Sequence, residues 1–182
     1  AFYAEHIPSR LQGVVASSSV PHEVLLSSLH GLATLPVDDA ARREAIDDLP
    51  SVEGRIVYLV DREGAAQSSL RLAHPSLKFD ALGDYYLAGL VNFNLGGTFD
   101  SRINLNLRED KGYTYGIRSG FAGGPEFGSF RISGEINQEA TAAAVTELLE
   151  ELERYAADGM TEEEYGYLQN AVGQSDALRY ET

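Results

Sequence analysis

Residues 113–136 read YTYGIRSGFAGGPEFGSFRISGEI, and their pattern is the clearest indication of a β-sheet in the chain. Two runs rich in aromatic and β-branched residues, YTYGIRSGFA and FGSFRISGEI, flank a Gly-Gly-Pro-Glu turn. If the second run is extended, Phe130, Ile132 and Ile136 share one face. The stretch therefore predicts two strands joined by a flexible turn, with Tyr115 early in the first strand.

A second strand pair is predicted upstream, at residues 54–61 and 65–74. In the latter run Leu70 and Leu72 alternate with Ser69 and Arg71, the pattern of a half-buried strand. Only a short Arg-Glu-Gly connection separates the two runs, so we expect a hairpin or near-hairpin.

Helices are predicted between and after the strand pairs. Asp80 is the expected cap of a helix that Gly96 and Gly97 end, and a second helix, ending by Gly112, places Arg108 in its last turn. Two further helices follow, the first capped by Asn137 and closed by Gly159, the second opened by a capping box of Thr161 and Glu164.

The N-terminal part predicts a strand at 11–18, a helix that begins near Pro21, and a polar linker at 36–53. The whole order suggests an α+β two-layer domain, in which an antiparallel or mixed sheet is covered by helices on one face. We expect residues 1–182 to form one such domain. Because the chain starts without methionine and stops within a predicted helix, we also expect it to be excised from a longer polypeptide.

The amino-acid composition limits the classes of binding partner that the chain is expected to have. With 14 Lys and Arg against 28 Asp and Glu, the formal net charge is -14, which argues against nucleic acids and anionic membrane surfaces and favours a peptide or a cation. The sequence has no cysteine, which excludes thiolate metal sites, and no apolar run near the roughly 20 residues of a membrane helix.

Familiar catalytic and cofactor motifs are missing from the sequence. No two of His6, His22, His30 and His74 stand at the i, i+4 spacing of a zinc helix, so we expect no metal site in this chain. The glycine-rich runs do not fit a phosphate-binding loop, and there is no G-x-S-x-G nucleophile motif. We expect no cofactor in this chain.

Arg108 and Tyr115, in the segment LREDKGYTYG, allow two interpretations. An arginine at a helix C-terminus interacts favourably with the helix dipole, and a tyrosine suits the surface of a sheet. Alternatively, the guanidinium could hold a peptide carbonyl or carboxylate while the phenol donates a hydrogen bond to an oxyanion. The residue types leave both interpretations open.

The run LGGTFDSRINLNLREDKGYTYG, residues 95–116, resembles the pitrilysin-like (M16, inverzincin) zinc metallopeptidase family. The similarity extends over nearly the whole chain, through FYAEHIPSRLQGVVASS, VYLVDREGAAQSSLRLAHP and ADGMTEEEYGYLQN. Members are built from homologous α+β halves around a chamber. One half carries an H-x-x-E-H zinc motif, and the other supplies an arginine and a tyrosine that contact substrate; by position these are Arg108 and Tyr115.

This chain contains no H-x-x-E-H, so it resembles the C-terminal, non-zinc domain of such a peptidase. The resemblance implies a substrate-contacting domain that is inactive alone and that works with a zinc-bearing half in the same polypeptide or in a partner subunit. Two alternatives stay open: a structural or assembly subunit like the core proteins of respiratory complex III, and a non-catalytic peptide-binding module. The sequence leaves the compartment undetermined, and a bacterial cell envelope or periplasm agrees with the resemblance.

Overall fold

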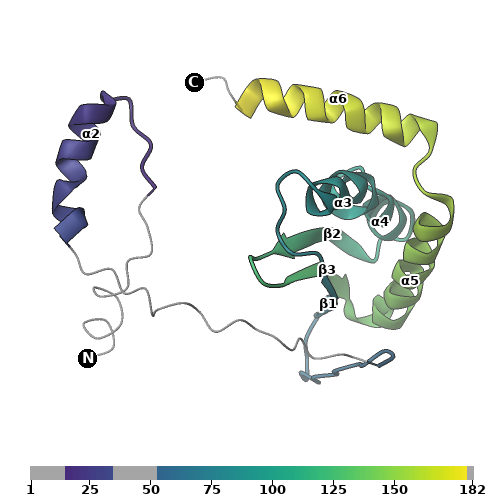
Figure 1. Cartoon of the computed structure of the whole chain (residues 1–182). Helices are drawn as coiled ribbons and strands as arrows, with labels where there is room; N and C mark the ends of the chain where they lie inside the picture. Colours follow the sequence, from purple (N-terminus) through teal and green to yellow (C-terminus); the bar gives the residue numbers. More distant parts are fainter. Residues whose placement is uncertain (1–14, 35–52, 180–182) are drawn as a thin grey trace. The chain divides into compact units, whose positions relative to one another are not determined.

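The computed structural model of the chain describes residues 15–34 and 53–179 (Figure 1). The chain divides into two units, residues 1–45 and 46–182. The predicted linker at 36–53 lies outside the described residues except for its last position, and so do residues 11–14 of the first predicted strand. The described remainder of that strand, residues 15–18, is not a strand.

In the first unit the predicted helix is α2, His22–Leu29, followed by the 3-10 turn η1, His30–Thr34. Pro21 precedes the first helical residue, and its carbonyl accepts the N–H groups of Val24 at 3.0 Å and Leu25 at 3.1 Å. Proline suits this position because the first helical N–H groups have no partner within the helix. No residue of α2 is buried within this unit.

The second unit is built on a three-stranded antiparallel sheet in the order β1-β3-β2. Its strands are β1, Gln67–Ser76; β2, Thr114–Gly123; and β3, Gly128–Asn137. Its helical segments are α3, Asp84–Asn92; the π-helical η2, Phe93–Gly97; α4, Arg102–Asn104; the π-helical η3, Leu105–Asp110; the 3-10 turn η4, Gln138–Ala140; α5, Thr141–Asp158; and α6, Glu162–Arg179.

The core lies between one face of the sheet and the helices (Figure 1). Its fully buried members come from α4, η3, β2, β3 and α5: Ile103, Leu107, Ile117, Ile132, Ile136, Ala144 and Leu148. The opposite face of the sheet is polar and exposed, as the alternating burial of all three strands shows. The predicted α+β class, with helices on one face of the sheet, is therefore confirmed.

Glycine 96 lets η2 pack directly against β2. A Cβ at Gly96 would stand 2.2 Å from the Ser119 hydroxyl oxygen and 2.4 Å from the Ile103 side chain, closer than any van der Waals contact. Next to it, Asn92 and Ser119 exchange hydrogen bonds: Asn92 Nδ2 donates to the Ser119 carbonyl at 3.0 Å, and the Ser119 hydroxyl donates to Asn92 Oδ1 at 2.5 Å. This buried polar pair fixes the helical layer on the sheet.

The prediction of a strand at 54–61 is wrong, and so is the prediction that it forms a hairpin with the next strand. Residues 54–61 form no strand, and Val57, Tyr58, Leu59 and Val60 are 85–88% exposed. The segment has the composition of a strand, but a strand needs a neighbouring backbone to accept and donate its hydrogen bonds. Within the described residues β1 pairs with β3 instead.

Neither of two predicted helix caps forms its capping hydrogen bond. Asp80 accepts the Leu82 N–H at 3.0 Å in a bend, and α3 begins later, after Gly83. Asn137 is the last residue of β3 and occupies the N-cap position of η4, which leads into α5, but its side chain makes no capping hydrogen bond. Its amide donates instead to the Gly112 carbonyl at 3.1 Å. Short polar side chains favour turns as well as caps, so local sequence alone does not separate the two.

Candidate functional site

Arg108 stands on the π-helical segment η3, as the sequence predicted for a helix end. The wider turn is visible in the hydrogen bond from the Lys111 N–H to the Asn106 carbonyl, at 3.0 Å, five residues back. Leu107, its neighbour, is fully buried and anchors the segment in the core. Arg108 therefore emerges at the rim of the helical layer, on a kind of turn that often occurs at functional sites.

The Arg108 side chain is held in place from two sides. Its guanidinium carbon lies 4.0 Å from the centre of the Phe99 ring, a cation–π contact. One of its nitrogens donates to the Glu109 carboxylate. The side chain remains 29% exposed, so the guanidinium is oriented and still has donors that face solvent.

Gly112 turns the chain from η3 into β2. It has a φ of +64°, which a residue with a side chain rarely adopts. Hydrogen bonds fix the crossing: the Tyr113 N–H donates to the Leu107 carbonyl at 2.8 Å, and the Asn137 amide donates to the Gly112 carbonyl at 3.1 Å. The separation between Arg108 and Tyr115 is thus set by ordered backbone.

Tyr115 projects from an irregularity at the start of β2. The register with β3 shifts between Thr114 and Ile117, so two residues, Tyr115 and Gly116, occupy the bulge. Thr114 is buried, and its hydroxyl donates to the Glu135 carbonyl at 2.6 Å. The bulge aims the Tyr115 side chain away from the core; it is 87% exposed, and its hydroxyl has no hydrogen-bond partner among residues 15–34 and 53–179.

The two predicted site residues are brought together by one open depression with a volume of about 290 Å³. Its lining consists of Arg108, Glu109, Gly112, Thr114, Tyr115 and Asn137. Of these lining residues, Glu109, Thr114 and Asn137 were not predicted from the sequence as part of a site. Thr114 and Asn137 could have been found only from the pairing of β2 with β3, which places both strands' ends beside the Gly112 turn.

The described part of the chain holds no cluster suited to a metal. No three His, Asp or Glu side chains within it are grouped closely enough to bind a metal ion. The described histidines, His22, His30 and His74, belong to no such group. None of the described helices is both long enough and apolar enough to cross a membrane.

The family model of the peptidase M16 inactive domain matches residues 1–172. The chain belongs to the peptidase M16 inactive-domain family. No curated protein matches it significantly. This domain is therefore of the non-zinc type, as the absence of an H-x-x-E-H motif predicted.

Several solved structures share this fold. The peptidase M16 inactive domain from Pseudomonas fluorescens is 29% identical, with a TM-score of 0.57, over 60% of this chain and 26% of that chain. A protease from Helicobacter pylori shares the fold with 14% identity and a TM-score of 0.69, over 90% and 40% of the two chains. The periplasmic protease PqqL from Escherichia coli does so with 15% identity and a TM-score of 0.62, over 87% and 18%. The chain thus spans well under half of each structure.

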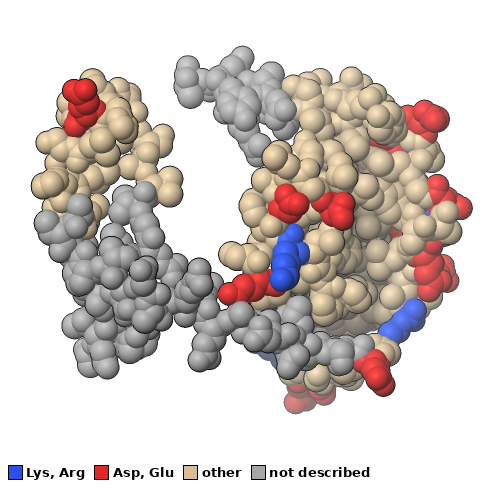
Figure 2. All heavy atoms as spheres, in the orientation of Figure 1, with Lys and Arg blue, Asp and Glu red and all other residues tan. Residues whose placement is uncertain are grey.

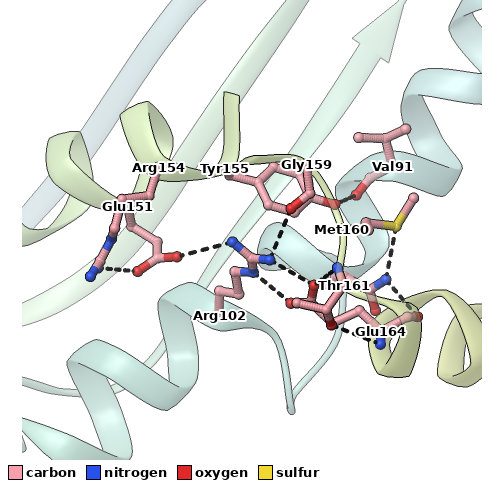
Figure 3. A network of polar contacts seen from close by, with 10 residues as sticks. Val91, Arg102, Glu151, Arg154, Tyr155, Gly159, Met160, Thr161 and Glu164 are labelled. Carbon is pink, nitrogen blue, oxygen red and sulfur yellow. Dashed lines mark hydrogen bonds and ion pairs between the residues drawn. The ribbon is translucent and has the colours of Figure 1, made fainter. Parts of the chain in front are cut away.

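A polar network joins three helices of this M16 domain (Figure 3). Arg102, on α4, donates to both oxygens of Glu164, on α6, at 2.5 and 2.7 Å, and to the Gly159 carbonyl at 3.0 Å. Its guanidinium also lies 3.8 Å from a Glu151 oxygen and 4.6 Å from the centre of the Tyr155 ring. Arg102 thereby ties α4 to α5 and α6.

One part of this network, the capping box of Thr161 and Glu164, was predicted from the sequence. The predicted capping box is confirmed, because the Thr161 N–H donates to Glu164 Oε2 at 2.7 Å and the Glu164 N–H donates to the Thr161 hydroxyl at 3.2 Å. The hydrogen bonds from Arg102, helped by those from Thr161, lower the pKa of Glu164 from 4.5 to about 2. Burial raises the pKa of the Tyr155 hydroxyl, which donates to the Val91 carbonyl at 2.7 Å.

The Glu164 carboxylate predicts an acid-sensitive fold. Its pKa is lower in the folded state, so its stabilising contribution is complete above about pH 4.5 and is lost as pH falls toward about 2. The shift corresponds to about 3 kcal/mol of unfolding free energy. We expect Glu164→Gln to lower the free energy of unfolding at pH 7, measured by urea denaturation. The free energy of unfolding of this variant should also fall less than that of the wild type between about pH 4.5 and about pH 2. Glu162→Gln, an exposed change in the same helical turn, should keep the wild-type pH profile; an unchanged profile for Glu164→Gln would contradict this role.

Proposed function

We propose that this chain is the substrate-contacting, non-zinc domain of a zinc-dependent endopeptidase. It works with a zinc-bearing homologous half, in the same polypeptide or in a partner subunit, and the two halves enclose the peptide in a chamber. The observation that carries the proposal is the depression that Arg108 and Tyr115 both line. Family membership supports it, and so do the proteases among the structural neighbours.

The two side chains offer complementary chemistry. Arg108 keeps solvent-facing N–H groups that can hold a peptide carbonyl or carboxylate, and its Phe99 and Glu109 contacts restrict its orientation before substrate arrives. Tyr115 has an exposed hydroxyl that can donate to the oxyanion of the tetrahedral intermediate. The zinc half is proposed to supply the hydrolytic chemistry, since the described residues of this chain include no metal-binding group.

Replacing Arg108 by alanine in the complete protein tests this proposal. A hydrogen bond to a charged group contributes about 1.5–3 kcal/mol, so Arg108→Ala should lower kcat/KM roughly 10- to 100-fold, mainly through KM. The measurement is zinc-dependent cleavage of an internally quenched peptide, with a chelator-treated sample as the blank.

A matched control separates this effect from a general loss of positive charge. Arg154→Ala changes an arginine that contacts Glu151 and lies outside the depression, and it should keep the wild-type kcat/KM. The thermal unfolding midpoints of Arg108→Ala and Arg154→Ala should both lie within a few degrees of the wild-type midpoint. Unchanged cleavage by folded Arg108→Ala would reject its assigned role, and absence of zinc-dependent cleavage by the complete protein would favour a structural subunit instead.

A further inference from the structure

The face of the sheet that the helices leave open carries three arginines, one on each strand. Arg71 on β1, Arg118 on β2 and Arg131 on β3 are exposed. The register places Ser133 opposite both Arg71 and Arg118, and Arg131 stands two residues before Ser133 on the same face. We name these three residues the basic face. On the side of the molecule seen in Figure 2, acidic side chains are more frequent than basic ones.

The three arginines of the basic face form no ion pair with any acidic side chain that the structure describes. Among the described residues no carboxylate lies within ion-pair distance of the three guanidinium groups; Arg131 donates only to the Ser129 hydroxyl, at 3.0 Å. The acidic residue on this face, Glu135, accepts from the Ser69 hydroxyl at 2.9 Å. Strands lie about 4.8 Å apart, so Arg71 and Arg118 stand about 10 Å from each other. Such like charges repel one another at low ionic strength, and they contribute nothing visible to the fold.

The basic face adjoins the proposed site. Tyr115 precedes Arg118 by three residues on β2, and the bulge between Thr114 and Ile117 lies between the two. An extended peptide advances about 3.3 Å per residue. A chain held at Tyr115 and continuing along the sheet would therefore bring a side chain over the basic face roughly two or three residues further on.

We infer that the basic face binds carboxylate side chains of the peptide, two or three residues from the bond to be cleaved. The inference rests on the proposed function and gives its substrate class: peptides with an Asp or Glu two or three residues from the cleavage site. Guanidinium groups match carboxylates with paired hydrogen bonds. A peptide is favoured over a nucleic acid, because the net charge of -14 repels a long phosphate backbone while a few local arginines still attract single carboxylates.

The test uses the complete protein and two quenched peptides that differ only in Glu or Gln at the second and third positions on either side of the bond. We expect wild-type protein to cleave the Glu peptide with about a tenfold higher kcat/KM at low salt, and the preference should shrink as salt is added. The triple variant Arg71→Gln, Arg118→Gln and Arg131→Gln should lose the preference. A matched triple variant, Arg55→Gln, Arg62→Gln and Lys78→Gln, removes the same charge away from the strands and should retain it.

The possible outcomes separate this inference from the proposed function. Equal cleavage of both peptides by wild type, or an undiminished preference in the Arg71, Arg118 and Arg131 variant, overturns the inference and leaves the endopeptidase proposal intact. If neither peptide is cleaved, fluorescence anisotropy of the labelled peptides decides: tighter binding of the Glu peptide, abolished by the same variant, supports the basic face while the peptidase proposal fails. Tighter binding of a single-stranded oligonucleotide than of the Glu peptide would overturn the inference as well.

Discussion

Tyr115→Phe in the complete protein is expected to lower kcat about 100-fold and to change KM little. The substitution removes only the phenolic hydroxyl, and loss of one oxyanion donor typically costs on the order of 10²–10³ in turnover. A donor used mainly in the transition state affects kcat rather than ground-state binding. Steady-state cleavage of a quenched peptide, with zinc present and with zinc removed, measures the effect.

The structure makes this experiment easy to interpret, because Tyr115 has no visible role in stability. Its side chain is 87% exposed, and the hydroxyl has no partner in the described part of the chain, so Tyr115→Phe should unfold at the wild-type temperature. Tyr86→Phe is the matched control, since Tyr86 is 48% exposed on α3 and lies outside the depression. If Tyr115→Phe turns over as fast as Tyr86→Phe, Tyr115 has no part in oxyanion stabilisation.

Local sequence patterns were sufficient to predict the elements that depend on interactions between neighbouring residues. Alternating residues such as Leu70, Leu72, Ile132 and Ile136 defined the strands and their buried face, which the structure confirms. The capping box of Thr161 and Glu164 was equally legible, because all its hydrogen bonds form within three residues. Such signals depend only on neighbouring residues and on the period of the element.

Features that depend on distant partners could not be predicted. The apolar run at 54–61 has the composition of a strand, yet strand formation requires a paired backbone that its own residues do not supply. The basic face combines Arg71, Arg118 and Arg131 only through the register of three strands. Likewise, no local pattern says that Arg102 meets Glu164, which lies 62 residues away.

The candidate site combines residues that the sequence indicated with contacts that it could not predict. Arg108 and Tyr115 were selected by family resemblance, since each residue alone suited an ordinary helix end or sheet surface. The depression that joins them depends on the positive φ of Gly112 and on the bulge after Thr114. Asn137, which lines the depression, had been assigned to a helix cap, because its contact with Gly112 joins two elements that are separate in sequence.

The Arg102 network gives the second large prediction, one of stability. Arg102→Ala removes two hydrogen bonds to Glu164 and one to the Gly159 carbonyl, and it leaves Glu151 and Glu164 without their shared cation. Its side chain is 19% exposed, and breaking a buried pair from one side costs about 3–5 kcal/mol. We expect a loss of about 3 kcal/mol in urea denaturation, together with faster hydrogen exchange at the start of α6.

Arg55→Ala provides the contrast that makes this loss informative. Arg55 pairs with Glu153 at 3.6 Å, but its side chain is 74% exposed, so its removal should cost less than about 1 kcal/mol. Arg102→Lys keeps the charge without the planar donors and should fall between the two. In Arg102→Ala the pKa of Glu164 should also rise from about 2 toward 4.5, so part of the acid sensitivity should vanish with the arginine. A loss no greater than that of Arg55→Ala would mean that α6 is held on the domain by its apolar contacts and that Arg102 contributes little.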